Sequence, residues 1–188
     1  MLMNKSSKEM KILVQRADKL GDVILSTPVI EALRTHYPHA KIDILTSKIG
    51  EDYCEGHEQI NKIYSIDLSL SFLKKMTYII KLIQNIRKEN YSLYISVWNR
   101  PILSYIGWLS KIPIRVGDSS NPTLKWLFTH KIKQSWCDFT RHQAEFNLEL
   151  LKSLKLPVLK MKRKVYIESN SQEWAKELIK TVKQKIKK

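Results

Sequence analysis

Residues 11–28 read KILVQRADKLGDVILSTP, and this stretch decides the fold. The apolar run at residues 12–15 predicts a buried strand. Beyond a charged turn, the apolar periodicity predicts a helix that continues to about His36. In an open α/β sheet, the loop at the carboxyl end of the first strand faces the ligand crevice. The polar and small residues of that loop are Arg16, Asp18, Lys19, Gly21 and Asp22. We therefore expect a ligand site directly after the first strand.

This loop contains a single glycine, Gly21. The dinucleotide-binding fingerprint needs three glycines, so that a pyrophosphate can lie against the backbone. We therefore expect no dehydrogenase-type cofactor, and favour a carboxylate, that of Asp22, aimed at a polar substrate. Thr27 and Pro28 suit the N-cap and first position of a helix, so the regular helix can begin there.

The rest of the chain alternates between predicted strands and predicted helices. Further strands are expected at residues 41–46, 62–66, 91–97, 112–116 and 129–132. Further helices are expected at residues 47–54, 69–88, 101–110, 121–128 and 140–154. Such alternation is typical of the α/β class with a doubly wound, mostly parallel, Rossmann-like sheet. Right-handed crossovers would bring the loops after the first, third and fourth strands to one edge.

The helix predicted at residues 69–88 is amphipathic. Its expected apolar face consists of Leu73, Met76, Ile80 and Ile83. Its basic residues at heptad spacing are Lys74, Lys81 and Lys88. A solvated face is the default interpretation of these lysines, and contact with an anionic membrane is the functional alternative.

Several segments resemble glycosyltransferase family 9, the lipopolysaccharide heptosyltransferase family, in the order in which that family has them. The first is Arg16-x-Asp18-x-Leu20-Gly21-Asp22-x-x-Leu25-x-Thr27-Pro28, followed by Ala32-Leu33-Arg34-x-x-Tyr37-Pro38. The later ones are the strand Tyr91-Ser92-Leu93-Tyr94-Ile95-Ser96, the segment Ile114-Arg115-Val116-Gly117, and His142-x-x-Glu145 with its following helix. The resemblance covers about residues 11–156. Ser96 departs from it, because the family commonly has Asp there.

The resemblance implies an inverting transfer of heptose from ADP-heptose to the lipopolysaccharide inner core, by a GT-B enzyme that needs no metal and no cofactor. It assigns the role of general base to Asp22. The alternative role for Asp22 is an ordinary carboxylate at a helix start, and the two can coexist. Gly21 is expected to let the backbone turn tightly and to keep the space before Asp22 open.

Three basic residues are candidates for binding anionic groups of the inner-core acceptor. They are Arg16, Lys19 and Arg100. A guanidinium can hold a carboxylate in a bidentate manner, whereas an ammonium acts as a point charge. For Arg16 and Lys19, the alternative is a local ion-pair set with Asp18.

The net charge of +15 is concentrated near the C-terminus. Residues 151–188 contain 12 Lys and Arg against 3 Asp and Glu, and residues 1–150 contain 21 against 15. We expect a solvated, lysine-rich helix end, with nonspecific binding of anionic lipid or nucleic acid as the alternative. No specific nucleic-acid partner is expected. Cys54 and Cys137 are expected to be reduced thiols, as is usual in a cytoplasmic protein. The protein is expected to be cytoplasmic, with a peripheral position at the inner membrane as the alternative.

We expect three segments: a disordered extension at residues 1–10, a Rossmann-like acceptor-binding domain at residues 11–156, and a basic linker with a terminal helix at residues 157–188. Ser169 or Asn170 is expected to cap that helix, which starts at about Gln172. The nucleotide-sugar domain of the resembled enzymes is expected to be absent, so the chain alone should be inactive and need a separate C-terminal half to use ADP-heptose. A noncatalytic remnant or split-enzyme subunit is the alternative, and a basic nucleic-acid-binding protein is a third.

Overall fold

A computed structural model describes residues 9–134, 141–157 and 169–186. Within these residues the strands form one sheet in the order β3-β2-β1-β4-β5-β6, and every neighbouring pair is parallel. The strands are β1 (Lys11–Arg16), β2 (Lys41–Ser47), β3 (Lys62–Ile66), β4 (Leu93–Ser96), β5 (Ile114–Asp118) and β6 (His130–Ile132). The predicted α/β, doubly wound parallel sheet is confirmed.

The helices differ from the predicted ones mainly at their ends. They are α1 (Leu20–Ile24), α2 (Thr27–His36), α3 (Lys48–Glu55), α4 (Phe72–Lys88), α5 (Pro101–Leu109), α6 (Gln143–Glu149) and α7 (Ser169–Ile186), with 3₁₀ turns η1 (Lys125–Leu127) and η2 (Leu150–Leu154). The helix expected to run to His36 is divided in two, and the regular helix α2 begins at Thr27, where the Thr27-Pro28 pair allowed it to begin, with Ser26 rather than Thr27 as the N-cap. At the break, the hydroxyl of Ser26 donates to the carbonyl of Val23, and that of Thr27 donates to the carbonyl of Ile24.

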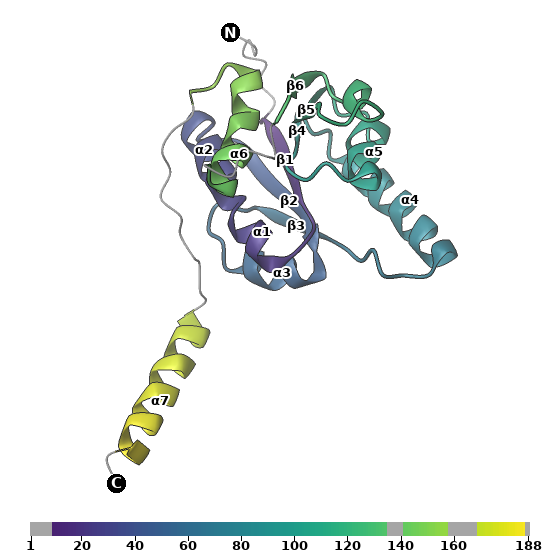
Figure 1. Ribbon diagram of the computed structural model, residues 1–188. Helices are drawn as coiled ribbons and strands as arrows, with labels where there is room; N and C mark the ends of the chain where they lie inside the picture. The colour runs from purple at the N-terminus through teal and green to yellow at the C-terminus, as the bar shows by residue number, and fades with distance from the viewer. Residues whose placement is uncertain (1–8, 135–140, 158–168, 187–188) are drawn as a thin grey trace.

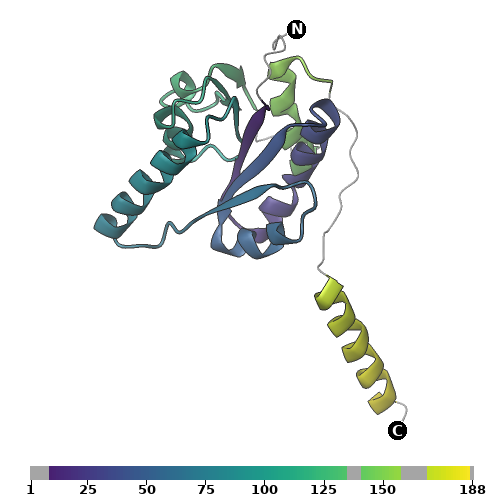
Figure 2. The ribbon, with the colours of Figure 1, turned by 180° about the vertical axis from the view of Figure 1, so that it is seen from behind.

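Helices cover both faces of the sheet (Figures 1 and 2). On one face, α1, α2, α3 and α6 bury Val23, Ile30, Leu33, Cys54 and Leu148 against the strands. On the other face, α4 and α5 bury Ile79, Leu82, Ile86, Leu103 and Ile106. Because β1 lies between β2 and β4, its residues 12–15 are fully buried by these two layers. This placement explains the continuous apolar run in β1.

The predicted apolar face of α4 is wrong. The helix buries Ile79, Leu82 and Ile86, whereas Leu73 and Ile80 remain 77% and 50% exposed. Ile83 alone of the four predicted residues packs partly against the core. The reason is that α4 has more apolar residues than the sheet can cover. These residues form two neighbouring stripes along the helix, each with helical spacing, and only one of the two stripes packs against the sheet.

The ends of the folded body also differ from the expected boundaries. The carbonyl of Met10 accepts a hydrogen bond from the backbone N–H of Lys41, and Glu9 forms an ion pair with the ammonium of Lys41. The folded body therefore includes residues 9 and 10, which were expected to be disordered. α7 begins at Ser169, three residues before the predicted start. Cys54 is a buried free thiol, whereas Cys137 and most of the expected basic linker lie outside the described residues.

Two glycines in helices give a matched test of this packing. A β-carbon on Gly107 of α5 would clash with the ring of Tyr94, which is fully buried and donates its hydroxyl to the carbonyl of Leu103. We expect Gly107→Ala to lower the free energy of unfolding by about 1–3 kcal/mol, the usual cost of overpacking. Gly21→Ala, with nothing within 4 Å of the added β-carbon, should raise it by up to about 1 kcal/mol. Urea unfolding measures both, and equal midpoints for the two variants would contradict the packing described.

Candidate functional site

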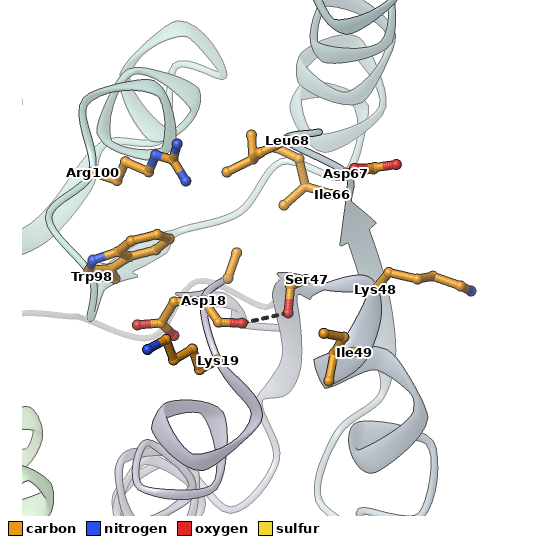
Figure 3. A pocket seen from close by; sticks show the side chains of 11 residues that line it. Asp18, Lys19, Ser47, Lys48, Ile49, Ile66, Asp67, Leu68, Trp98 and Arg100 are labelled. Atoms are coloured by element: carbon orange, nitrogen blue, oxygen red, sulfur yellow. Dashed lines mark hydrogen bonds between the residues drawn. The ribbon is translucent and has the colours of Figure 1, made fainter. Parts of the chain in front are cut away.

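A pocket of about 390 Å³ lies at the edge where the carboxyl ends of four parallel strands meet (Figure 3). The ends of β1, β2, β3 and β4 and the segments that follow them each contribute to its wall. The lining residues are Ala17, Asp18, Lys19, Ser47, Lys48, Ile49, Ile66, Asp67, Leu68, Trp98 and Arg100. Its position agrees with the general rule that ligands bind outside the carboxyl ends of the strands in open α/β sheets.

Arg16 connects two carboxylates beside this pocket. Its guanidinium contacts both oxygens of Asp18, at 2.9 and 2.8 Å, and one oxygen of Asp22 at 3.0 Å. It also donates to the carbonyl of Val97 at 3.3 Å. The side chain of Arg16 is only 5% exposed, so little of it remains for an acceptor anion. This is the local ion-pair set that the sequence left open as the alternative, extended to Asp22.

The protonation of Asp18 reflects its burial. Burial raises the pKa of the Asp18 carboxyl above its usual value, and the nearby charge of Asp22 acts in the same direction. The guanidinium of Arg16 opposes this rise in pKa, but does not cancel it. The site therefore depends on the positive charge of Arg16 to offset the repulsion between two neighbouring carboxylates.

Asp22 lies in the first turn of α1, with its side chain 33% exposed. Its backbone N–H donates to the carbonyl of Lys19. Among the described residues, no backbone N–H donates to its carboxylate, so a capping hydrogen bond does not account for this side chain. Asp22 is not part of the pocket wall, whereas Asp18 is. Arg16 links the two carboxylates directly, because its guanidinium forms an ion pair with each of them.

The structure brings Lys19 and Arg100 together in the pocket wall, from the loops after β1 and β4. The guanidinium of Arg100 lies over the ring of Trp98, 5.2 Å from its centroid. Gly21 is part of α1 and does not have a positive φ, so its position does not use the backbone freedom that is particular to glycine. The space beside Gly21 is open.

Sequence reasoning missed the contribution of Ser47, at the junction of β2 and α3. The hydroxyl of Ser47 donates to the carbonyl of Asp18 at 2.8 Å, which connects this junction to the loop after β1 (Figure 3). The same hydroxyl accepts from the backbone N–H of Gly50 at the start of α3. The available signal was position alone, since Ser47 directly follows the strand predicted at residues 41–46. Ser96, the residue that departs from the family pattern, is buried, and its hydroxyl donates to the side chain of Gln15.

Within the described part of the chain, no group of three or more His, Cys, Asp or Glu side chains is arranged to hold a metal ion. His36, one of two histidines flanking Pro38, instead has its Nε2 atom 3.1 Å from the carbonyl oxygen of Pro157.

Curated relatives of the chain are glycosyltransferases. The chain is 29% identical over 143 residues to lipopolysaccharide heptosyltransferase 3 of Escherichia coli strain K12. This match covers 71% of the chain and 39% of that protein. The chain is 27% identical over 159 residues to a putative glycosyltransferase of Haemophilus influenzae, covering 81% of this chain and 44% of the relative. The chain thus spans about two fifths of the length of these relatives. No family model matches the sequence.

Solved structures establish the fold independently. A glycosyl transferase family 9 protein from Veillonella parvula superimposes with a TM-score of 0.80 at 22% identity, over 92% of this chain and 49% of that one. The Escherichia coli heptosyltransferase WaaC, solved with ADP-2-deoxy-2-fluoro heptose, gives a TM-score of 0.68 at 15% identity, over 83% and 52% of the two chains. In both, the match covers about half of the solved chain.

Proposed function

Because the chain belongs to glycosyltransferase family 9, over the part of such enzymes that it spans, we propose that it forms the acceptor-binding half of a heptosyltransferase. The observation that carries the proposal is the loop after β1, where Arg16 holds the carboxylate of Asp22 beside a pocket at the carboxyl edge of the sheet. The acceptor in this proposal is the lipopolysaccharide inner core, and the donor is ADP-heptose held by a second domain.

In the proposed reaction, Asp22 acts as the general base. It takes the proton from an acceptor hydroxyl while that oxygen forms a bond to the anomeric carbon of the donor sugar. The bond from the anomeric carbon to the ADP oxygen breaks, ADP leaves with the electron pair, and the configuration inverts. The exposure of about a third of the Asp22 side chain is compatible with an approaching hydroxyl.

The pocket residues have distinct roles in this proposal. Lys19 and Arg100 provide positive charge for the carboxylate and phosphate groups of the inner core. The ring of Trp98 gives an apolar wall for a sugar face and keeps the guanidinium of Arg100 in place. We place Arg16 beneath the site as the residue that orients Asp22, since its guanidinium is already engaged.

In an alternative arrangement, the chain is one subunit of a split enzyme at the cytoplasmic face of the inner membrane. A separately encoded C-terminal half then completes the crevice, and the chemistry is the same. A noncatalytic remnant would bind the acceptor without turnover. A neighbouring reading frame that encodes a nucleotide-sugar domain would favour the split enzyme.

Calorimetric titration of the 188-residue chain tests the proposal. Delipidated inner-core oligosaccharide should give saturable binding, whereas ADP-heptose should give none near micromolar affinity. Arg100→Gln should weaken oligosaccharide binding by about tenfold, the value of one good charge-assisted hydrogen bond. Arg87→Gln, an exposed arginine at the far end of α4, is the matched control and should bind as the unmodified chain does. Tight binding of ADP-heptose without oligosaccharide binding would overturn the assignment.

A further inference from the structure

α4 carries an apolar surface that the protein itself does not cover. Phe72 and Leu73, in its first turn, are 75% and 77% exposed, and Met76 and Ile80 continue the exposed apolar stripe along the helix. Figures 1 and 2 both show this end of α4 extending away from the sheet. At 100° per residue, the stripe lies beside the buried stripe of Ile79, Leu82 and Ile86, on the solvent side.

The charge on α4 is of one sign. Its 17 residues contain five cations and no carboxylate, and the exposed lysines Lys74 and Lys81 lie on the far side of the apolar stripe from the core. A shallow hollow of about 450 Å³ lies beside these two lysines. Its lining residues are Leu70, Leu73, Lys74, Thr77, Tyr78 and Lys81. Such a helix presents apolar side chains and ammonium groups together, as helices that lie in a membrane interface do.

α7 differs from α4 in this respect. It also exposes apolar residues, Trp174 among them, but Glu173 and Glu177 lie on the same helix. In addition, α4 is fixed against the sheet by its buried stripe and by the hydroxyl of Tyr78, which donates to the carbonyl of Ser65. The outward face of α4 is therefore set by the fold.

We propose that α4 docks the protein onto an anionic lipid bilayer, with Phe72 and Leu73 inserted at the headgroup level and Lys74 and Lys81 on lipid phosphates. None of the described helices has the length and hydropathy to cross a bilayer. The loop that leads into α4 has Asp67 and Leu68 in the wall of the candidate site and Leu70 in the hollow. Docking through α4 therefore places the mouth of the candidate site beside the lipid surface.

Vesicle co-sedimentation of the full chain tests this surface. Binding should be strong on phosphatidylcholine vesicles containing phosphatidylglycerol and weak on phosphatidylcholine alone. The double variant Phe72→Ser/Leu73→Ser should lower the partition coefficient by about tenfold or more, because both side chains lose apolar burial in the bilayer. Lys74→Gln/Lys81→Gln should lower it by about fivefold per lysine, from about 1 kcal/mol for each charge near an anionic surface, and added salt should shrink this loss.

The matched controls are on α7. Trp174→Ser removes a side chain that is 65% exposed, and Lys176→Gln/Lys180→Gln removes two exposed charges. Both variants should bind vesicles within about twofold of the unmodified chain. Because the four α4 side chains are exposed, thermal melts should remain unchanged and show that the variants fold. Loss of binding in the α7 variants but not in the α4 variants, or equal binding to neutral vesicles, would overturn the proposal. The assay contains neither sugar nor nucleotide, so its result is separate from that of the proposed transferase.

Discussion

Replacing Asp22 by asparagine is expected to lower turnover by about two to four orders of magnitude, the usual contribution of a general base. The measurement uses the chain supplied with the C-terminal half of a family 9 heptosyltransferase, with ADP-heptose and inner-core acceptor. Asparagine keeps the size of the side chain but lacks the basic lone pairs that accept the hydroxyl proton. Acceptor affinity should hardly change, because the loss is felt mainly in the transition state.

Two further observations make this result decisive. Asp22→Asn also breaks the ion pair with Arg16, which should lower the free energy of unfolding by about 1 kcal/mol, because Asp22 is partly exposed. Asp52→Asn on α3, an exposed carboxylate away from the pocket wall, is the matched control and should retain full turnover. Turnover that stays intact in Asp22→Asn while the melting temperature falls would rule out the base.

The second large effect is expected at Arg16. Arg16→Leu should lower the free energy of unfolding by about 3 kcal/mol, because breaking a buried ion pair leaves a carboxylate without its partner. Asp18 carries most of this cost, since its side chain is only 12% exposed and was held by two contacts to the guanidinium.

The loss in Arg16→Leu should depend on pH in a defined direction. Burial already raises the pKa of Asp18, and removal of Arg16 raises it further. As the pH falls through that raised pKa, Asp18 takes up a proton in the folded state and the destabilisation shrinks. Urea unfolding as a function of pH measures this, with Arg16→Lys as the variant that keeps a charge but loses the bidentate contact. A destabilisation that is the same at low and neutral pH would contradict the ion-pair account.

The central strands were predictable because they are buried on both faces. The mostly apolar run at residues 12–15 leaves few alternatives to a central parallel strand, and it was placed to within a residue at each end. The edge strand at residues 62–66 was also placed to within a residue, although it is only partly buried. The helix boundaries were less predictable, because side-chain hydroxyls such as those of Ser26 and Thr27 end α1 by bonds that periodicity does not encode.

The error on α4 and the choice left open at Arg16 have a common cause. Periodicity marks which positions are apolar, but the sheet decides which of them it covers, so the exposed position of Leu73 could not be read from the pattern. Likewise, the sequence placed Arg16, Asp18 and Asp22 in one loop, but their mutual contacts depend on how α1 turns back over the end of β1. Trp98 became recognisable as a site residue only once the sheet order put β4 beside β1.

The central claim is that the acceptor binds at the carboxyl edge of the sheet beside Asp22. Amide chemical-shift mapping of the chain during titration with inner-core oligosaccharide tests it most directly. The account predicts saturable shifts at residues 17–22, 47–49, 66–68 and 98–100, together with the indole N–H of Trp98. Shifts confined to the opposite edge of the sheet, around Asn90 and Lys111, or no shifts at saturating oligosaccharide, would contradict it.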